Sequence, residues 1–151
     1  MKKVLSLVAL AMISTIMFAV NDGVKADQNK KEAKSGEVIV MNKEMFINDV
    51  FDYQNSKEWK YKGDKPAIID LYADWCGPCR MLGPVLEKAA ETLPDGVQIV
   101  KYNVDECQDV ASQLGVRGIP TLAVYKDGQL QAQQAGAMNS AQFSEFLKNF
   151  I

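Results

Sequence analysis

The sequence predicts a single α/β domain in which helices cover a mixed β-sheet. Strand-like runs of apolar and β-branched residues alternate with amphipathic helical segments in the order βαβαβαββα. Near the end of the chain, two strand-like runs flank Asp127-Gly128, a dipeptide typical of tight hairpin turns. The length of 151 residues suits one domain, and 48% hydrophobic with 24% charged residues is a globular composition.

Residues 1–26 have the pattern of a signal peptide and are left out of the predicted fold. A basic start precedes an apolar run over residues 4–20, and Ala26 completes a small-residue cleavage pattern. We expect cleavage after Ala26, and therefore a periplasmic or secreted protein. An uncleaved membrane anchor is the alternative, since an apolar run of about 17 residues is at the lower limit for a membrane span. Residues 27–36 are polar and lysine-rich, which predicts a flexible leader before a domain over 37–151.

The domain is expected to begin with a strand followed by a helix. Residues 37–41 are a short β-branched run, which predicts the strand. Asn42 is suited to cap the helix, because its side chain accepts hydrogen bonds from the free N–H groups of a first turn. The apolar face of this helix would hold Met45, Phe46, Val50 and Phe51. Residues 53–64 are polar apart from three large aromatic side chains and are left unassigned.

The middle of the domain predicts two strands around a long helix. Residues 67–72 are an apolar run interrupted by Asp70, which indicates a buried strand. Residues 76–93 have a helical pattern, and Pro84 within it should kink the helix because proline lacks a backbone donor and clashes with the preceding turn. Residues 97–104 predict the next strand.

The last third predicts a helix, a hairpin and a final helix. The helix over 105–114 has its first and fourth residues, Asp105 and Gln108, spaced as a capping box. The hairpin strands are expected over 121–125 and 130–135. An asparagine at position 139 is suited to cap the final helix. The apolar face of that helix would hold Phe143, Phe146, Leu147 and Phe150.

The composition excludes several kinds of function. The chain has no histidine, which removes histidine acid–base catalysis, Cys–His nucleophile pairs and Cys/His zinc sites. A formal net charge of −2 offers no basic surface for nucleic acid. The 3 cysteines are too few for a disulfide-stapled scaffold and need another explanation.

Cys76 and Cys79 form a C-x-x-C pair where a helix is expected to follow a buried strand. Residues three apart in a helical turn share a face with Cα atoms roughly 5–6 Å apart, which suits a disulfide. The helix N-terminus favours a thiolate at Cys76, and the thiolate is the attacking species in disulfide exchange. Cys79, one turn further on, should be more buried and should resolve the mixed disulfide.

Two other uses of this pair are disfavoured. A zinc site would need two more ligands and only Cys107 remains as a soft one, so we expect no metal. A purely structural disulfide across so small a loop would restrict the unfolded chain little.

Asp70 is a second candidate for chemistry, because a carboxylate inside an apolar strand is costly unless it is paired or protonated. A raised pKa at Asp70 would suit proton transfer near neutral pH. An aspartate at a strand end that faces water is the alternative.

The sequence resembles the thioredoxin family at two motifs. Ala73-Asp74-Trp75-Cys76-Gly77-Pro78-Cys79-Arg80 is similar to the active-site signature of the family, and Gly118-Ile119-Pro120-Thr121 is similar to its cis-proline loop. The resemblance covers residues 37–151, and it implies a central mixed sheet flanked by helices, with the cysteines exposed beside the cis-proline.

The resemblance also implies roles for single residues. Cys76 would be the nucleophile and Cys79 the resolving thiol. Asp70 matches a buried aspartate proposed to take the proton of Cys79, and Lys101 matches a lysine near that aspartate, although a strand lysine pointing outward is the alternative. Ile119 would offer backbone groups to an extended substrate chain. The positions expected to contact substrate are Trp75, Gly77, Pro78, Ile119, Pro120 and Gly136.

Three features depart from the usual family pattern. Residues 53–61, which include Trp59, are longer than the corresponding segment; they either pack as a longer helix end or contact a partner. Tyr72 replaces a tryptophan, which we expect to change only packing. Cys107 falls in the first turn of a predicted helix, where it is either a small residue without a role or the site of a regulatory or intermolecular disulfide.

The resemblance predicts a monomeric thiol–disulfide oxidoreductase that acts on disulfide-containing proteins. The Gly-Pro dipeptide between the cysteines resembles reducing members of the family, whereas oxidants and isomerases commonly have a histidine there. No cofactor is expected, because the electrons reside in the cysteine pair. Compartments outside the cytoplasm are usually oxidising, so a reductase there would need a membrane thiol donor. A disulfide donor or isomerase is the main alternative, and a non-catalytic binding module is disfavoured because it would not need both thiols.

Overall fold

A computed structural model of the chain describes residues 36–56, 58, 60–106 and 108–151. The expected signal peptide with its cleavage site after Ala26, the leader up to residue 35, Trp59 and Cys107 lie outside the described residues. Within the described part of the chain, no helix is both long and apolar enough to span a bilayer.

Five strands form one mixed sheet in the spatial order β1-β3-β2-β4-β5. The strands β1 and β2 run parallel to β3, whereas β4 runs antiparallel to β2 and β5. Their bounds are β1 (Val38–Met41), β2 (Ala67–Tyr72), β3 (Gln98–Asn103), β4 (Thr121–Lys126) and β5 (Gln129–Ala135). The parallel strands end at the same edge of the sheet, and this edge receives the site.

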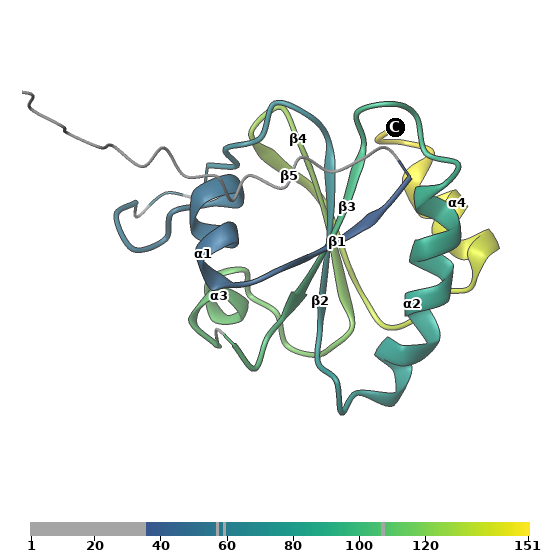
Figure 1. The fold of residues 1–151 in the computed structure, drawn as a ribbon, viewed down its shortest axis with the longest axis horizontal. Helices are drawn as coiled ribbons and strands as arrows, with labels where there is room; N and C mark the ends of the chain where they lie inside the picture. The colour runs from purple at the N-terminus through teal and green to yellow at the C-terminus, as the bar shows by residue number, and fades with distance from the viewer. Residues whose placement is uncertain (1–35, 57, 59, 107) are drawn as a thin grey trace, which may run out of the picture.

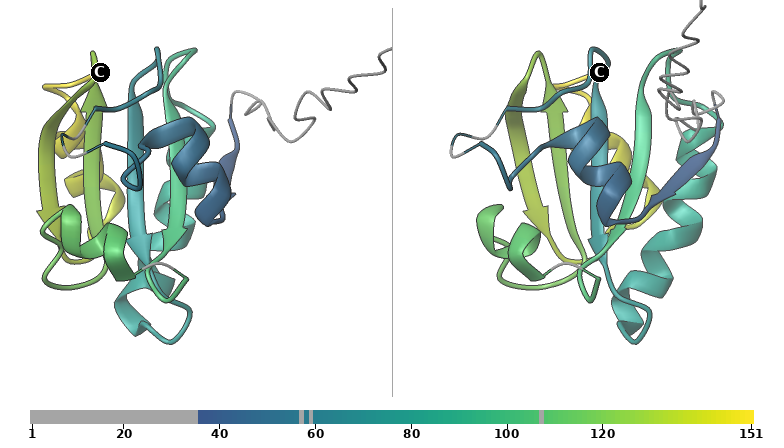
Figure 2. Two further views of the ribbon diagram at one scale, coloured as in Figure 1. Left: turned by 90° about the vertical axis from the view of Figure 1, so that its left-hand side faces the viewer. Right: turned by 60° about the vertical axis from the view of Figure 1, so that its left-hand side comes forward.

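Helices cover both faces of this sheet. Figure 1 shows α2 and α4 on one side and α1 with α3 on the other, and the turned views in Figure 2 show the same layers. The bounds are α1 (Lys43–Met45), the π-helical turn η1 (Phe46–Val50), α2 (Gly77–Ala90), α3 (Gln108–Gln113) and α4 (Ser140–Leu147). The predicted α/β class, a mixed sheet flanked by helices, is confirmed.

Two apolar cores result, one on each face of the sheet. Alternate residues of β2 point to opposite faces, so Ile68 packs with Leu82 of α2 and Phe143 of α4, while Leu71 packs in the other core with Phe46. Because both faces are covered, β2 is an apolar run without polar alternation, apart from Asp70. Asp70 follows the alternation of Ile68 and therefore lies on the α2 face.

Local signals set the helix starts and the hairpin as predicted. Asn42 caps α1, and the side chain of Asn139 caps α4 in a full capping box with Gln142. The turn between β4 and β5 is made by Asp127 and Gly128, whose φ angles of 53° and 77° match the left-handed conformation that such two-residue turns require.

Four helix boundaries differ from the prediction. Helix α4 ends at Leu147, so Phe150, which was expected on its apolar face, lies beyond it. The helix after Asn42 changes into the π-helical turn η1, where the Phe51 N–H donates to the Phe46 carbonyl. Helix α2 ends at Ala90 rather than at residue 93, because Pro94 disfavours helical geometry in the residue before it. Helix α3 begins at Gln108, three residues later than expected from Asp105, which lies in a turn.

Candidate active site

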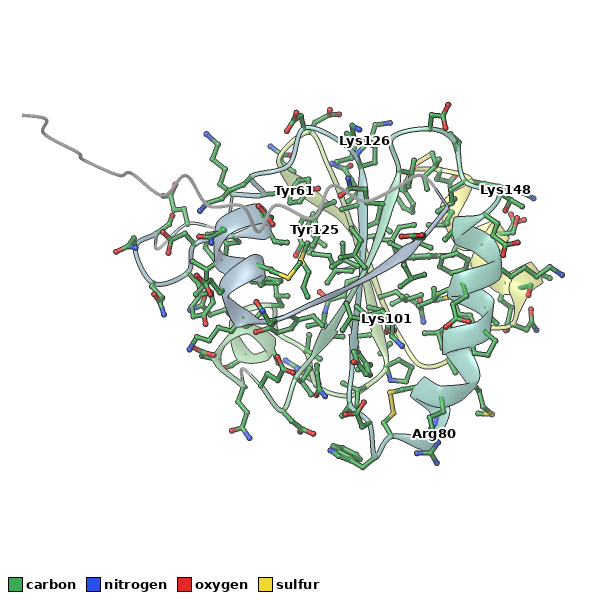
Figure 3. All side chains as sticks on the ribbon, in the orientation of Figure 1. Tyr61, Arg80, Lys101, Tyr125, Lys126 and Lys148 are labelled. Carbon is green, nitrogen blue, oxygen red and sulfur yellow. A yellow bond between two sulfur atoms is a disulfide. The ribbon has the colours of Figure 1, made fainter. Side chains whose placement is uncertain are left out.

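The cysteine pair lies at the junction between the end of β2 and the start of α2. Cys76 is the N-cap of α2 and Cys79 lies in its first turn, with Gly77 and Pro78 between them as the first helical residues. The two cysteines are joined by a disulfide, and their Cα atoms are 5.3 Å apart, within the range expected from the spacing. Figure 3 shows the start of α2, marked by Arg80, at one end of the sheet, with Tyr61 and Tyr125 toward the other end.

The surroundings of the two sulfur atoms are more closed than the sequence suggested. Cys76 is 4% exposed and Cys79 is 3% exposed, so the expected contrast between an exposed and a buried cysteine is not present. Both pack with Ala73, and Tyr72 and Ile119 cover the cluster.

The backbone of α2 is oriented to stabilise negative charge on Cys76. The Cys79 N–H donates to Cys76 Sγ at 3.2 Å. This N–H is one of the free donors at the helix N-terminus, so in the reduced form it would bond to the Cys76 thiolate. Such a contact lowers the pKa of a cysteine and increases its thiolate fraction.

The cis-proline loop lies against the disulfide. The Ile119–Pro120 bond is cis, and the Ile119 carbonyl oxygen is 3.7 Å from Cys76 Sγ. Within the described residues, no hydrogen bond occupies the backbone N–H of Ile119. The Pro120 carbonyl accepts from the N–H of Gly136, whose φ of 97° is a conformation that disfavours residues with a side chain. The loop thus holds one residue with available backbone groups next to the reactive sulfur.

Asp70 is completely buried. Its exposure is 0%, and neither carboxyl oxygen has a hydrogen-bond partner. Burial raises its pKa to about 7, while the positive charge of Lys101 acts in the opposite direction. The alternative of an aspartate facing water is therefore wrong.

Lys101 lies opposite Asp70 on the neighbouring strand. The parallel register pairs the two residues, so both side chains lie on the face of the sheet that α2 covers. The Lys101 ammonium lies over the ring of Tyr72, and it makes no ion pair with Asp70 within 4 Å. Lys101 is half-buried rather than turned fully outward.

A hydrogen-bonded clamp beside the disulfide was not predicted from the sequence. Trp75 is 68% exposed, and its Nε1 donates to Asp105 Oδ2 at 2.8 Å. The Asp105 N–H donates to the side-chain oxygen of the buried Asn103, and the Asn103 amide donates to Asp74 Oδ2. Arg80 closes the loop from the helix side by donating to the Asp74 carbonyl oxygen.

The clamp orients Trp75 next to the cysteine pair. The one sequence signal for it is Asp105, which follows a buried strand, but the spacing of Asp105 and Gln108 predicts a helix cap instead. Trp75 and Pro78, one residue before and two residues after Cys76, remain exposed and form an apolar rim beside it.

The arrangement fits two-electron exchange between a dithiol and a disulfide. It supplies a cysteine pair that can close into a ring, a donor aimed at one sulfur, and a buried carboxyl that titrates near neutral pH. Among the described residues, no three of His, Cys, Asp and Glu lie close enough together to hold a metal ion.

The similarity of the chain to known proteins agrees with this chemistry. The chain matches the family model described as Thioredoxin over residues 37–149. It is 41% identical over 114 residues to a thioredoxin of Borreliella burgdorferi, which covers 75% of this chain and 97% of the relative. It is 40% identical over 111 residues to a thioredoxin of Haemophilus influenzae, which covers 74% of this chain and 100% of the relative.

We predict that Asp70→Asn stabilises the disulfide form above pH 7 and not at pH 4. The pKa of Asp70 is raised to about 7 from 3.8, so the folded state keeps a proton that the unfolded chain has released, and stability falls as pH rises through that interval. The gain from removing the charge should reach about 4 kcal/mol at most. Urea unfolding at both pH values measures it, with the exposed Asp64→Asn as control. An equal effect at both pH values would contradict a buried titrating carboxyl.

We predict that Asp105→Ala loosens Trp75 without unfolding the domain. The substitution removes the acceptor of the indole N–H, which contributes about 1 kcal/mol or more because the acceptor is charged. In a Trp59→Phe background, fluorescence anisotropy of Trp75 should fall, and KM for a protein disulfide should rise. Glu106→Ala removes a neighbouring exposed carboxylate that makes no bond to the indole, and it should leave both values unchanged. Equal effects of the two variants would rule out the clamp.

Proposed function

This chain belongs to the thioredoxin family of thiol–disulfide oxidoreductases, and on that premise we propose that it reduces disulfide bonds in exported proteins. The observation that carries the proposal is the position of the Cys76–Cys79 pair at the N-terminus of α2, in contact with the cis-proline loop. This position combines an activated sulfur with a place for an extended substrate segment.

The reaction has two exchange steps. The Cys76 thiolate attacks one sulfur of a substrate disulfide, a mixed disulfide forms, and the other substrate sulfur leaves as a thiolate. Cys79 then attacks Cys76 Sγ, the second substrate thiolate leaves, and the Cys76–Cys79 disulfide closes. Two electrons have passed from the protein dithiol to the substrate.

Asp70 is suited to take the proton that Cys79 must lose in the second step. A thiol is a poor nucleophile until it is deprotonated, and a buried carboxylate with a pKa of about 7 is a base matched to neutral pH. Lys101 contributes a positive charge near the carboxylate. Asp70 is therefore assigned as the proton acceptor, and Lys101 as a nearby positive charge that lowers the pKa of the Asp70 carboxyl.

Backbone pairing and a small apolar rim are suited to bind the substrate. The N–H of Ile119 can bond to an extended segment that carries the target disulfide, as in the addition of a strand to a sheet edge. Gly77 lacks a side chain that would obstruct this segment, and Trp75 and Pro78 offer apolar contact. Recognition through backbone groups would accept many protein sequences.

The direction of electron flow is inferred from the dipeptide between the cysteines. Gly77-Pro78 resembles reducing members of the family. The signal-peptide pattern in residues 1–26 supports a periplasmic or secreted site of action, where a membrane thiol donor would have to keep a monomeric reductase reduced. The same oxidising surroundings favour the second candidate, a disulfide donor or isomerase acting through the same pair.

We predict that Cys79→Ser accumulates mixed disulfides with exported proteins. Without the resolving thiol, Cys76 stays bonded to its substrate, and non-reducing gels of acid-quenched cells should show bands that collapse on reduction. Adding Cys76→Ser to this variant should remove every band, while Cys107→Ser in its place should leave them. Retention of the bands without Cys76 would assign the attack to another thiol, and trapped partners that are all cytoplasmic would refute the proposed compartment.

A further inference from the structure

The Lys101 ammonium lies near Asp70 in a position that the pairing of the two strands does not by itself explain. Lys101 is paired directly with Asp70, yet its ammonium forms no ion pair with the carboxyl oxygens, which have no partners. The Lys101 Nζ instead lies 4.3 Å from the centre of the Tyr72 ring. Tyr72 is two residues after Asp70 on the same strand, so its ring lies on the same face.

Helix α2 closes the other side of this position. A Cβ atom added to Gly83 would lie 3.9 Å from Lys101 Nζ, so the ammonium sits between the Tyr72 ring and the backbone of α2. The face of an aromatic ring carries negative potential, and a cation within about 6 Å of its centre is attracted to it. The ring therefore holds the ammonium where a half-buried lysine would otherwise extend toward water.

We propose that Tyr72 is a positioning residue, whose ring keeps the Lys101 ammonium near the buried Asp70 carboxyl. Tyr72 was expected to affect packing only. The geometry gives it an electrostatic role, because the location of the one nearby cation decides how far the charge of Asp70 is compensated.

The other residues packed around Asp70 carry no charge that could compensate its carboxylate. Leu122 of β4 is paired with Asp70 on its other side, and Gly83 and Leu82 are the buried α2 residues here, so these elements present no charge. Cys79 is closed in the disulfide and does not titrate in this form. From α4, Phe143 and Leu147 complete the apolar layer.

Tyr72 itself remains neutral in the relevant range. Burial raises the pKa of its hydroxyl, and the negative charges of Asp74, Glu106 and Asp70 act in the same direction. An uncharged ring attracts the ammonium through its face alone, so removal of the hydroxyl should not matter, whereas removal of the ring should.

Removing the ring should release the ammonium to water. Asp70 would then lose part of the compensation for its negative charge and would hold its proton to higher pH. The consequence for the second exchange step rests on the proposed function, in which Asp70 takes the proton of Cys79. The titration of Asp70 can be measured without any substrate.

The experiment is a titration of Asp70 by carbon NMR of its side-chain carboxyl in the disulfide form. Tyr72→Leu should raise the midpoint by about half a pH unit, as expected from the size of an exposed cation–π contact. Tyr72→Phe and Tyr72→Trp keep a ring and should titrate as the wild type. Tyr72→Met is a second variant without a ring, in case Tyr72→Leu does not fold.

A double-variant cycle separates charge positioning from packing. Lys101→Met should raise the midpoint at least as far as Tyr72→Leu, and Tyr72→Leu should add nothing in the Lys101→Met background. A shift that persists without Lys101 would mean that Tyr72 acts through burial, and it would overturn the inference. A downward shift, or an equal shift in Tyr72→Phe, would also overturn it. If Cys79→Ser traps no partner while the cycle behaves as described, the proposed function fails and this inference stands.

Discussion

The site depends on one geometric condition, which is that α2, capped by Cys76, begins at Gly77 shortly after β2 ends at Tyr72. The buried face of α2, through Leu82 and Leu86, fixes the helix on the sheet, and the sheet fixes the strand. The two sulfur atoms are therefore held at bonding distance by the fold, and the Cys79 N–H of the first turn points at Cys76 Sγ.

Polar groups lie on both sides of this junction, in different surroundings. On the buried side, burial raises the pKa of Asp70, and its carboxyl has no hydrogen-bond partner, which is unfavourable for stability. On the exposed side, the Asp105 carboxylate accepts from the Trp75 indole N–H, and the Asp105 N–H donates to the side-chain oxygen of Asn103. In the proposed function, the buried carboxyl accepts a proton, and the contacts around Trp75 keep the proposed substrate surface in place.

Much of the architecture followed from sequence patterns, because the strands are buried and the caps are local. The apolar run over 67–72, the Asp127-Gly128 turn and the cap at Asn139 each depend on neighbours in the chain. The predicted start of α3 at Asp105 was wrong by three residues. The Asp105 carboxylate accepts from the distant Trp75 indole, and a local capping pattern does not show such a tertiary contact. The placement of Lys101 over Tyr72 could not be predicted either, since spacing gives the face of a strand and not the direction of a long side chain. The expectations for Trp59, Cys107 and the cleavage after Ala26 stay predictions.

The measurement that tests the account most directly is the redox state of Cys76 and Cys79 in intact cells, by rapid acid quench and alkylation of free thiols. A pair that is mostly reduced while located outside the cytoplasm is the predicted result, because a reductase must be supplied with electrons before it meets its substrates. A pair that stays fully oxidised under every growth condition would contradict the account, and would assign the chain to disulfide donation.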